Sequence, residues 1–336
     1  MCALNDARRQ AVMAERHDVT AIIETTGLRK SFGKAEKAVE AVRGVDLRVE
    51  TGEIFGFLGP NGAGKTTTLR MLTTLLAPTS GDALVAGVDL RRQPATVRER
   101  IGYVGQAGGS DPLETGRREL VIQGRLYGLN RAEASRRTVA LLSAFELDAV
   151  ADRRTSTYSG GQRRRLDVAL GMINQPVLLF LDEPTTGLDP QARARLWDEV
   201  RRLRDGGTSV FLTTHYLDEA DALCDRVAII DHGSIVAQGT PLELKRQVAG
   251  DVVTLGVATD PEGVLGLVQG EPYVREASVD AGNIRLYVEN GDAALPQLLR
   301  LLDGAGRPPT TISLHRPSLD DVFLRQTGRS LREQAA

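Results

Sequence analysis

The residues with the clearest chemical meaning run from Gly59 to Thr67 and read Gly-Pro-Asn-Gly-Ala-Gly-Lys-Thr-Thr. This pattern is typical of a phosphate-binding P-loop. Its glycines let backbone N–H groups turn toward a polyphosphate, and the helix that follows adds favourable partial charge. Lys65 would reach the β- and γ-phosphates, and Thr66 would ligate Mg²⁺. The runs Ile54–Leu58 and Thr67–Leu76 predict the strand and the helix that a P-loop needs on either side.

Two adjacent acids, Asp182 and Glu183, follow the continuous apolar run Val177–Leu181. Such a run is typical of a parallel strand buried on both faces. Asp182 suits indirect ligation of Mg²⁺ as the acidic partner of a P-loop. Glu183 points in a different direction because side chains alternate along a strand, and it would activate a water molecule as general base. Taken alone, the pair is equally well explained as solvated acids at a strand end. The P-loop upstream favours the catalytic interpretation.

A second anion site is predicted at Tyr158–Gln162, which reads Tyr-Ser-Gly-Gly-Gln before a helix-like run. Serine, paired glycines and a helix N-terminus together can hold an anion. A lone turn of this kind is weak support, and the arginines at 163–165 are typical of a solvated helix face.

These groups need strands to position them, and the sequence predicts three that end at the right places. Gly59 follows one strand, Asp182 follows another, and His215 follows the run Ser209–Thr214. In an open α/β sheet, ligands lie at the carboxyl ends of the strands. We therefore predict an α/β fold of the P-loop NTPase class.

The segments around these strands predict further elements. Residues 21–53 read as β-rich, a strand ends at Ile101–Gln106, and Leu113–Asn174 reads as helical. The helical segment has eight positions that we expect to be buried: Leu120, Leu126, Leu141, Leu142, Phe145, Leu147, Leu166 and Leu170. A helix is expected over Pro190–Arg204, and a hairpin about residues 231–234.

A second, smaller domain is predicted from about Thr240, where Thr-Pro-Leu-Glu is a strong helix start. Strands are expected at 252–257, 273–279, 283–288 and 311–315, with helices at 261–267, 292–302 and 319–326. This order matches the split βαβ pattern of a small α+β, ferredoxin-like domain.

Composition narrows the class of protein. A chain of 336 residues suggests two domains, and a net charge of −2 gives no electrostatic case for a nucleic-acid partner. Cys2 and Cys224 form neither a disulfide framework nor a zinc pattern, which fits a reducing cytosol. The sequence has no apolar run near the ~20 residues of a membrane helix, and residues 1–20 read as a polar, disordered extension.

In its ordered set of motifs the chain resembles the ATP-binding subunits of ABC transporters. Besides the P-loop (Walker A), these motifs are Gln106 (Q-loop), Tyr158–Gln162 (signature), Leu178–Asp182 (Walker B), Gly187–Asp189 (D-loop) and His215 (switch histidine). The resemblance covers about residues 22–240. It implies an ABC ATP-binding domain over 21–240, with a helical subdomain at about 107–175, and an accessory domain over 241–336.

The resemblance also implies roles for individual residues and a head-to-tail homodimer, in which the signature of one subunit covers the ATP held by the other. Gln106 would contact Mg²⁺ and the attacking water, and His215 would hydrogen-bond the γ-phosphate. Nucleotide contacts are assigned to Phe32, Gly59, Pro60, Asn61, Gly62, Ala63, Gly64, Lys65, Thr66, Thr67, Ser159, Gly160, Gly161, Gln162 and Asp189, Mg²⁺ contacts to Thr66, Gln106 and Asp182, and hydrolysis to Glu183, His215 and Gln106. Two positions depart from the commonest pattern: Tyr158 stands for leucine, and Phe32 for the tyrosine that often stacks on adenine.

Within the family, the chain is most similar to the drug-exporter group typified by the daunorubicin-resistance ATPase. The C-terminal domain ending Leu-Asp-Asp-Val-Phe-Leu (319–324) is one of the suggestive features. In that group the permease is a separate membrane chain, so we expect a peripheral protein on the cytoplasmic face of the membrane. Two alternatives are a soluble ABC ATPase that acts on ribosomes or DNA, and a module that sequesters a drug or regulator.

Overall fold

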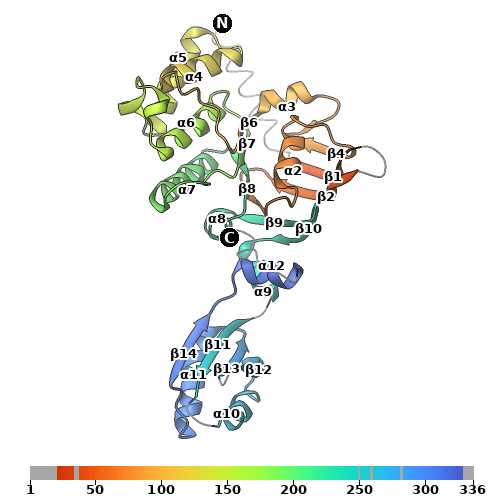
Figure 1. Cartoon of the computed structure of the whole chain (residues 1–336), viewed down its shortest axis with the longest axis vertical. Coiled ribbons are helices and arrows are strands. Elements are labelled where there is room, and N and C mark those ends of the chain that lie inside the picture. Colours follow the sequence, from red (N-terminus) through yellow and green to blue (C-terminus); the bar gives the residue numbers. More distant parts are fainter. Residues whose placement is uncertain (1–20, 34–37, 249, 258–259, 281–282, 328–336) are drawn as a thin grey trace. The chain divides into compact units, whose positions relative to one another are not determined.

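The computed structural model describes residues 21–33, 38–248, 250–257, 260–280 and 283–327 (Figure 1). They form two compact units, one that ends at Gln238 and one that begins at Gly239. The extension expected over residues 1–20 lies outside the described residues. Within those ranges, no helix combines the length and the apolar character that crossing a membrane requires.

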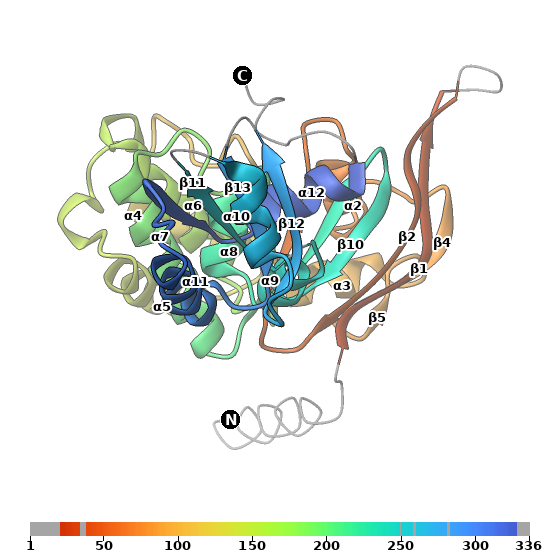
Figure 2. The same ribbon diagram turned by 90° about the horizontal axis from the view of Figure 1, so that it is seen from below.

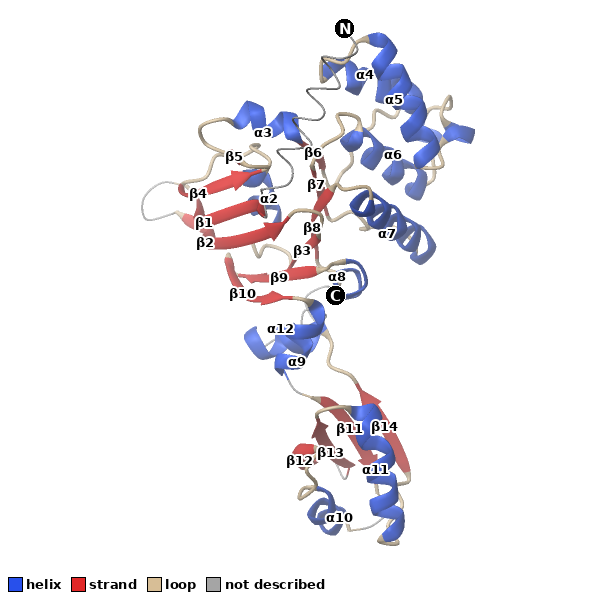
Figure 3. Cartoon of the chain, turned by 180° about the vertical axis from the view of Figure 1, so that it is seen from behind, coloured by secondary structure: helices blue, strands red, loops and turns tan. Residues whose placement is uncertain are grey.

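A six-stranded sheet is the centre of the first unit, with strand order β10-β9-β3-β8-β7-β6 (Figures 1 and 3). Its strands are β3 (Ile54–Leu58), β6 (Ile101–Val104), β7 (Leu178–Asp182), β8 (Ser209–Thr214), β9 (Arg226–Asp231) and β10 (Ser234–Gly239). The pairs β3–β8, β3–β9, β6–β7 and β7–β8 are all parallel. Their carboxyl ends therefore meet at one edge, as the α/β prediction requires.

A second, antiparallel sheet has the order β2-β1-β4-β5, and its long β1–β2 ribbon stands out in Figure 2. Its strands are β1 (Ala21–Phe32), β2 (Val39–Glu50), β4 (Ser80–Val85) and β5 (Val88–Asp89). This confirms the β-rich opening segment. The helices α2 (Lys65–Leu72) and α3 (Pro94–Arg100) contribute side chains to the same hydrophobic core as both sheets.

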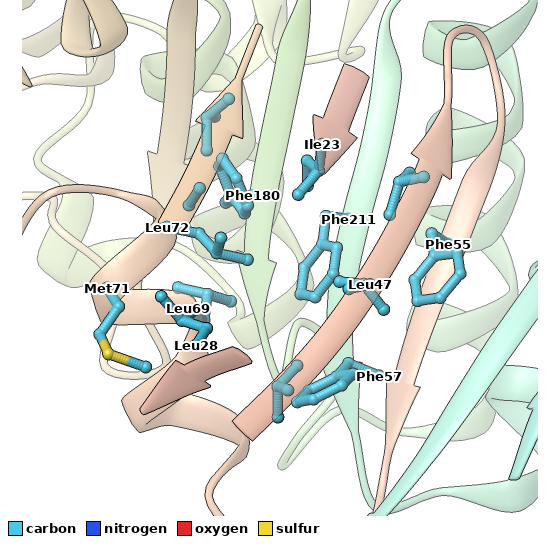
Figure 4. Close-up of a cluster of buried hydrophobic side chains, with 14 of the residues drawn as sticks. Ile23, Leu28, Leu47, Phe55, Phe57, Leu69, Met71, Leu72, Phe180 and Phe211 are labelled. Atoms are coloured by element: carbon cyan, nitrogen blue, oxygen red, sulfur yellow. The ribbon is translucent and has the colours of Figure 1, made fainter. Parts of the chain in front are cut away.

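Four phenylalanine rings pack among aliphatic side chains in the hydrophobic core (Figure 4). The ring of Phe211 lies 5.7 Å from that of Phe55, 5.6 Å from that of Phe57 and 5.5 Å from that of Phe180. These distances are typical of favourable aromatic pairs. Because the four rings come from β3, β7 and β8, they fix the three strands whose ends carry the candidate site.

Helices complete the first unit: α4 (Gly116–Leu126), α5 (Arg131–Ala144), α6 (Gly160–Met172), α7 (Pro190–Asp205) and α8 (Leu217–Leu223). In the helical segment 113–174, six of the expected core positions are buried, and Leu141 is half-buried. The prediction for Leu126 is wrong, because its side chain is 77% exposed. Leu126 is the last residue of α4 and lies at the rim of a surface groove.

The second unit has the element order β11 (Asp251–Gly256), α10 (Pro261–Val268), β12 (Val274–Asp280), β13 (Asn283–Val288), α11 (Gly291–Gly304) and β14 (Thr311–His315). The sheet order is β12-β13-β11-β14, and each neighbouring pair is antiparallel. This confirms the split βαβ prediction. The flanking helices are α9 (Pro241–Val248) and α12 (Leu319–Thr327); α9 begins with the expected capping box, formed by Thr240 and Glu243.

Candidate functional site

The P-loop lies between β3 and α2, and its backbone needs glycine. Gly62 and Gly64 have φ angles of 81° and 108°, which favour glycine over other residues. A Cβ on Gly59 would collide with the carbonyl of Ile230, and one on Gly64 would lie 2.6 Å from the carbonyl of Ala41. The helix begins at Lys65 and ends at Leu72, whereas Thr67–Leu76 was predicted. It ends early because the chain turns at Thr74, which has a φ of 63°.

Lys65 lies at the centre of the site and is almost fully buried. Its Nζ donates hydrogen bonds to the carbonyls of Gly59 at 2.8 Å and Pro60 at 3.1 Å. It also pairs with Glu183 Oε1 at 3.3 Å. Burial lowers the pKa of Lys65, whereas the charges of Glu183 and Asp182 act in the opposite direction. A single cation thus lies among backbone acceptors in the loop that the sequence assigns to phosphate.

Oxygen atoms converge on Asp182 at the end of β7. Its Oδ1 accepts hydrogen bonds from Thr66 Oγ1 at 3.2 Å and Thr213 Oγ1 at 2.7 Å. Among the described residues, no group of three His, Cys, Asp or Glu side chains is placed to hold a metal. One carboxylate beside a hydroxyl suits a hard divalent cation that takes its remaining ligands from phosphate and water.

Glu183 is the point at which the catalytic candidates meet. Gln106 Nε2 donates a hydrogen bond to Glu183 Oε2 at 3.0 Å. His215 Nδ1 lies 3.3 Å from the same oxygen, without the alignment of a hydrogen bond. Burial opposes ionisation of Glu183, but the contacts with His215 and Lys65 outweigh it and hold its pKa below the ordinary value. The side chain is therefore an ionised carboxylate at neutral pH, as a general base must be.

The backbone of Glu183 is also unusual. Its φ is 45°, in the left-handed region that residues with a Cβ rarely adopt. The Glu183 N–H donates to both the carbonyl, at 3.1 Å, and Oγ1, at 3.0 Å, of Thr213 on the neighbouring strand. Strained backbone of this kind persists where surrounding contacts hold it, and it is common at active sites. Here it turns the chain sharply at the end of β7.

The signature residues lie at a helix N-terminus and not at the end of a strand. Ser159 caps α6 and forms a capping box with Gln162. Asp189 caps α7 through its side chain, which accepts a hydrogen bond from the N–H of Ala192 at 2.9 Å. Ser159, Gly160 and Asp189 are exposed. Among the hydrogen bonds of the described residues, none joins them to the P-loop of the same chain.

Phe32 ends β1 and exposes 44% of its surface. Its ring is an accessible aromatic face, and Lys30 Nζ lies 5.3 Å from its centroid. The neighbouring strand β2 contributes the Ala41 carbonyl beside Gly64, so the same ribbon approaches the P-loop.

Two residues of the site were missed in the sequence. Thr213 supports both Asp182 and Glu183, and the Thr-Thr-His end of the strand was the available signal. Arg164 was interpreted as part of a solvated face, but it is 6% exposed and donates to three backbone carbonyls. Three consecutive arginines give no indication of which one is buried.

Comparisons with known proteins agree with this geometry. The ABC transporter family matches residues 42–186, and the C-terminal domain family of DrrA1-3-like ATP-binding proteins matches residues 239–327. The fold and the site therefore define an ATP-binding cassette of the P-loop class.

Relatives along almost the whole chain narrow the class further. The daunorubicin resistance ATP-binding protein DrrA2 of Streptomyces coeruleorubidus is 45% identical over 91% of this chain and 95% of its own length. The doxorubicin resistance ATP-binding protein DrrA of Mycobacterium tuberculosis (strain H37Rv) is 42% identical over 93% and 95%. The Nod factor export ATP-binding protein I of Paraburkholderia xenovorans is 38% identical over 93% and 99%.

Solved structures match the first unit. An ATP-binding subunit of an ABC transporter has a TM-score of 0.59 and 30% identity, over 67% of this chain and 92% of that one. The dimeric cassette MJ0796, bound to ADP and phosphate, has a TM-score of 0.60 at 23% identity, over 65% of this chain and 98% of that one, and shows the fold alone. The chain belongs to the daunorubicin- and doxorubicin-resistance family of ABC transporter ATP-binding subunits. It binds and hydrolyses ATP, and the comparisons favour a transporter ATPase that drives export over an ABC ATPase unrelated to transport.

Proposed function

We propose that Glu183 is the general base of ATP hydrolysis. It would take a proton from the attacking water while the water oxygen forms a bond to the γ-phosphorus and ADP leaves. The observation that carries this role is the meeting of Lys65, Gln106 and His215 on one ionised carboxylate. Gln106 would orient the water, His215 would contact the γ-phosphate, and Lys65 would bind the β- and γ-phosphates.

The P-loop residues Gly59–Thr67 would hold the phosphates through backbone N–H groups, and Phe32 would stack on the adenine. Thr66, Asp182 and Gln106 would hold Mg²⁺, and their oxygen donors suit that ion. Bound Mg²⁺ would neutralise charge that develops on the phosphate oxygens.

The active unit would be a head-to-tail homodimer. Ser159, Gly160, Gly161, Gln162 and Asp189 would then contact the ATP held by the P-loop of the second copy. The support for this arrangement is that Ser159 and Gly160 at the N-terminus of helix α6 are exposed, and that Gly161 is half-buried. Donors at a helix N-terminus are suited to the γ-phosphate of a nucleotide.

A separate permease would dock on the first unit beside the Gln106 loop. A groove of about 680 Å³ lies there, lined by residues that include Leu75, Tyr103, Leu126 and Tyr127. Leu75 is 59% exposed and Leu126 is 77% exposed, so the rim is apolar where a partner would cover it. Tyr103 and Tyr127 also line the cavity that contains Gln106. The docking groove and the cavity beside the catalytic residues would therefore have these two side chains in common. The protein would then be a peripheral subunit at the cytoplasmic face of the membrane.

The transported compound would be a hydrophobic, drug-like molecule exported from the cell. The relatives named for daunorubicin and doxorubicin resistance support this choice. The test is cellular accumulation of doxorubicin when the chain is expressed with its permease, beside Lys65→Met as a control. We expect lower accumulation only with the unaltered chain. Equal accumulation in the two strains would contradict drug export.

The ATPase proposal is tested separately with purified protein. We expect the specific activity to rise with protein concentration, because two copies build each site, and to be lost in Glu183→Gln. A specific activity that stays constant down to nanomolar protein would contradict the dimer. Normal hydrolysis by Glu183→Gln would contradict the base.

A further inference from the structure

Helix α6 carries four ionisable side chains that the proposed reaction does not use: Arg163, Arg164, Arg165 and Asp167. Arg164 is nearly buried, and its guanidinium donates to three backbone carbonyls. Nε bonds to Pro184 O at 2.7 Å, Nη1 to Gly105 O at 2.8 Å and Nη2 to Asp182 O at 3.1 Å. One side chain therefore joins the ends of β6 and β7 to the signature helix.

Asp167 holds the other end of the loop that contains Gln106. Its Oδ1 accepts the N–H groups of Gly109 at 3.0 Å and Ser110 at 3.2 Å. Gly108 has a φ of 76°, and a Cβ there would come within 2.5 Å of Asp167 Oδ2, so the loop lies directly against this carboxylate. The segment 105–110 is thus bonded to α6 at both ends.

Packing does not hold this loop in the same way. A cavity of about 440 Å³ adjoins it and is lined by Gln106, Ala107 and Gly108, among others. A loop beside open volume lacks the dense contacts that fix a core segment. The hydrogen bonds from α6, which include two from Arg163 to Ser110, therefore hold the backbone on both sides of Gln106.

The planar fork of Arg164 suits this task. A guanidinium presents its N–H groups in fixed directions, so it can hold several acceptors at a defined geometry, which a lysine cannot. Two of its acceptors, Asp182 O and Pro184 O, flank Glu183. The third, Gly105 O, precedes Gln106. A displacement of α6 therefore moves the backbone next to Gln106 and the backbone next to Glu183, and so changes the contact between these two side chains.

We propose that Arg164, supported by Asp167, is a positioning residue for hydrolysis, which fixes Gln106 and Glu183 relative to the signature helix. This inference rests on the roles proposed above for Gln106 and Glu183. Helix α6 begins at the signature, which would contact the ATP held by the second copy. The position of α6 on that ATP therefore sets how Gln106 and Glu183 are arranged in the copy to which α6 belongs. Arg164 therefore acts on the rate of the chemical step and not on nucleotide affinity.

The test compares Arg164→Met with Arg165→Met in the purified full-length protein. Arg165 is the matched control: it is the next residue of the same helix, its side chain is only 12% exposed, and its Nη1 donates to Phe145 O within the helical subdomain. We expect Arg164→Met to lower kcat for ATP at least tenfold with KM changed less than threefold. Arg165→Met should keep kcat within twofold, and Arg164→Lys should fall between the parent and Arg164→Met.

A double-mutant cycle with Gln106→Ala separates positioning from general damage. If Arg164 acts through the Gln106 loop, the double variant has nearly the kcat of Gln106→Ala alone. Effects that multiply, or equal kcat values for Arg164→Met and Arg165→Met, would overturn the proposal. Unfolding in urea, followed by the fluorescence of Trp197, checks that each variant is folded. Absence of hydrolysis by the parent protein would instead contradict the proposed catalytic roles.

Discussion

Replacing Lys65 with methionine tests whether the site is held by its central ion pair. Lys65 and Glu183 lie 3.3 Å apart, and their side chains are only 4% and 7% exposed. Removing one partner of a buried pair leaves the other charge without compensation, which costs about 3–5 kcal/mol. Gln106 and His215 remain beside Glu183, so we expect the lower end, about 3 kcal/mol, in the free energy of unfolding without nucleotide.

Urea unfolding followed by tryptophan fluorescence is the suitable assay. Trp197 is the single tryptophan of the chain and lies in α7, so it reports on the first unit alone. The same substitution in a Glu183→Gln background should cost about 2 kcal/mol less, because the partner charge is already gone. Equal costs in the two backgrounds, or an unchanged free energy for Lys65→Met, would refute the ion-pair reasoning.

The cost of Lys65→Met in unfolding free energy should depend on pH in a definite direction. In the parent, the pKa of Glu183 is lowered from the ordinary value of 4.5, so this group stabilises the fold above that pH. Its contribution is lost as pH falls through the lowered pKa. Without Lys65, one of the two cationic contacts that lower the pKa of Glu183 is lost, so burial raises this pKa more effectively. The free-energy difference between parent and Lys65→Met should therefore shrink as pH falls from 7.5 to 4; a constant difference would contradict this.

Three further predictions concern other parts of the chain. Glu183→Gln should lower kcat at least 100-fold and leave the Kd for ATP within threefold, measured by nucleotide titration; a large loss of affinity would contradict a purely catalytic role. Leu126→Asp should abolish permease-dependent efflux and leave the ATPase of the purified subunit unchanged. Leu84→Asp, also at an exposed leucine, is the control and should leave both efflux and ATPase unchanged. Burial raises the pKa of Glu199 to about 7, so this group weakens the fold as pH rises from 4.5 toward 8; Glu199→Gln should recover up to about 3 kcal/mol of unfolding free energy at pH 8 and little at pH 5.

The positions of the strands could be predicted because they depend on local pattern. The run Val177–Leu181 is apolar throughout, as burial on both faces demands, and β7 occupies nearly the same residues. The glycines of the P-loop were equally clear, since Gly62 and Gly64 have φ angles that favour glycine. In the second unit, the expected order of strands and helices matches the split βαβ order of the structure.

The sequence could not show which face of each helix packs against the rest of the protein and which face is exposed. Leu126 has the spacing of a core residue, but α4 ends there and its side chain lines a groove. Arg163, Arg164 and Arg165 are chemically identical, and only the fold decides that the middle one enters the site. The left-handed φ of Glu183 depends on Thr213 of a neighbouring strand, 30 residues away, which no local pattern encodes.

The central claim is that each ATP site is built from the P-loop of one copy and the signature of another. The most direct test mixes Lys65→Met, which has a damaged P-loop, with Gly160→Glu, which has a damaged signature. Each variant alone should be inactive. In an equimolar mixture, half of the dimers contain one copy of each, and one of their two sites has both parts intact. The account predicts about a quarter of the parental ATPase activity. A mixture as inactive as its components would contradict it.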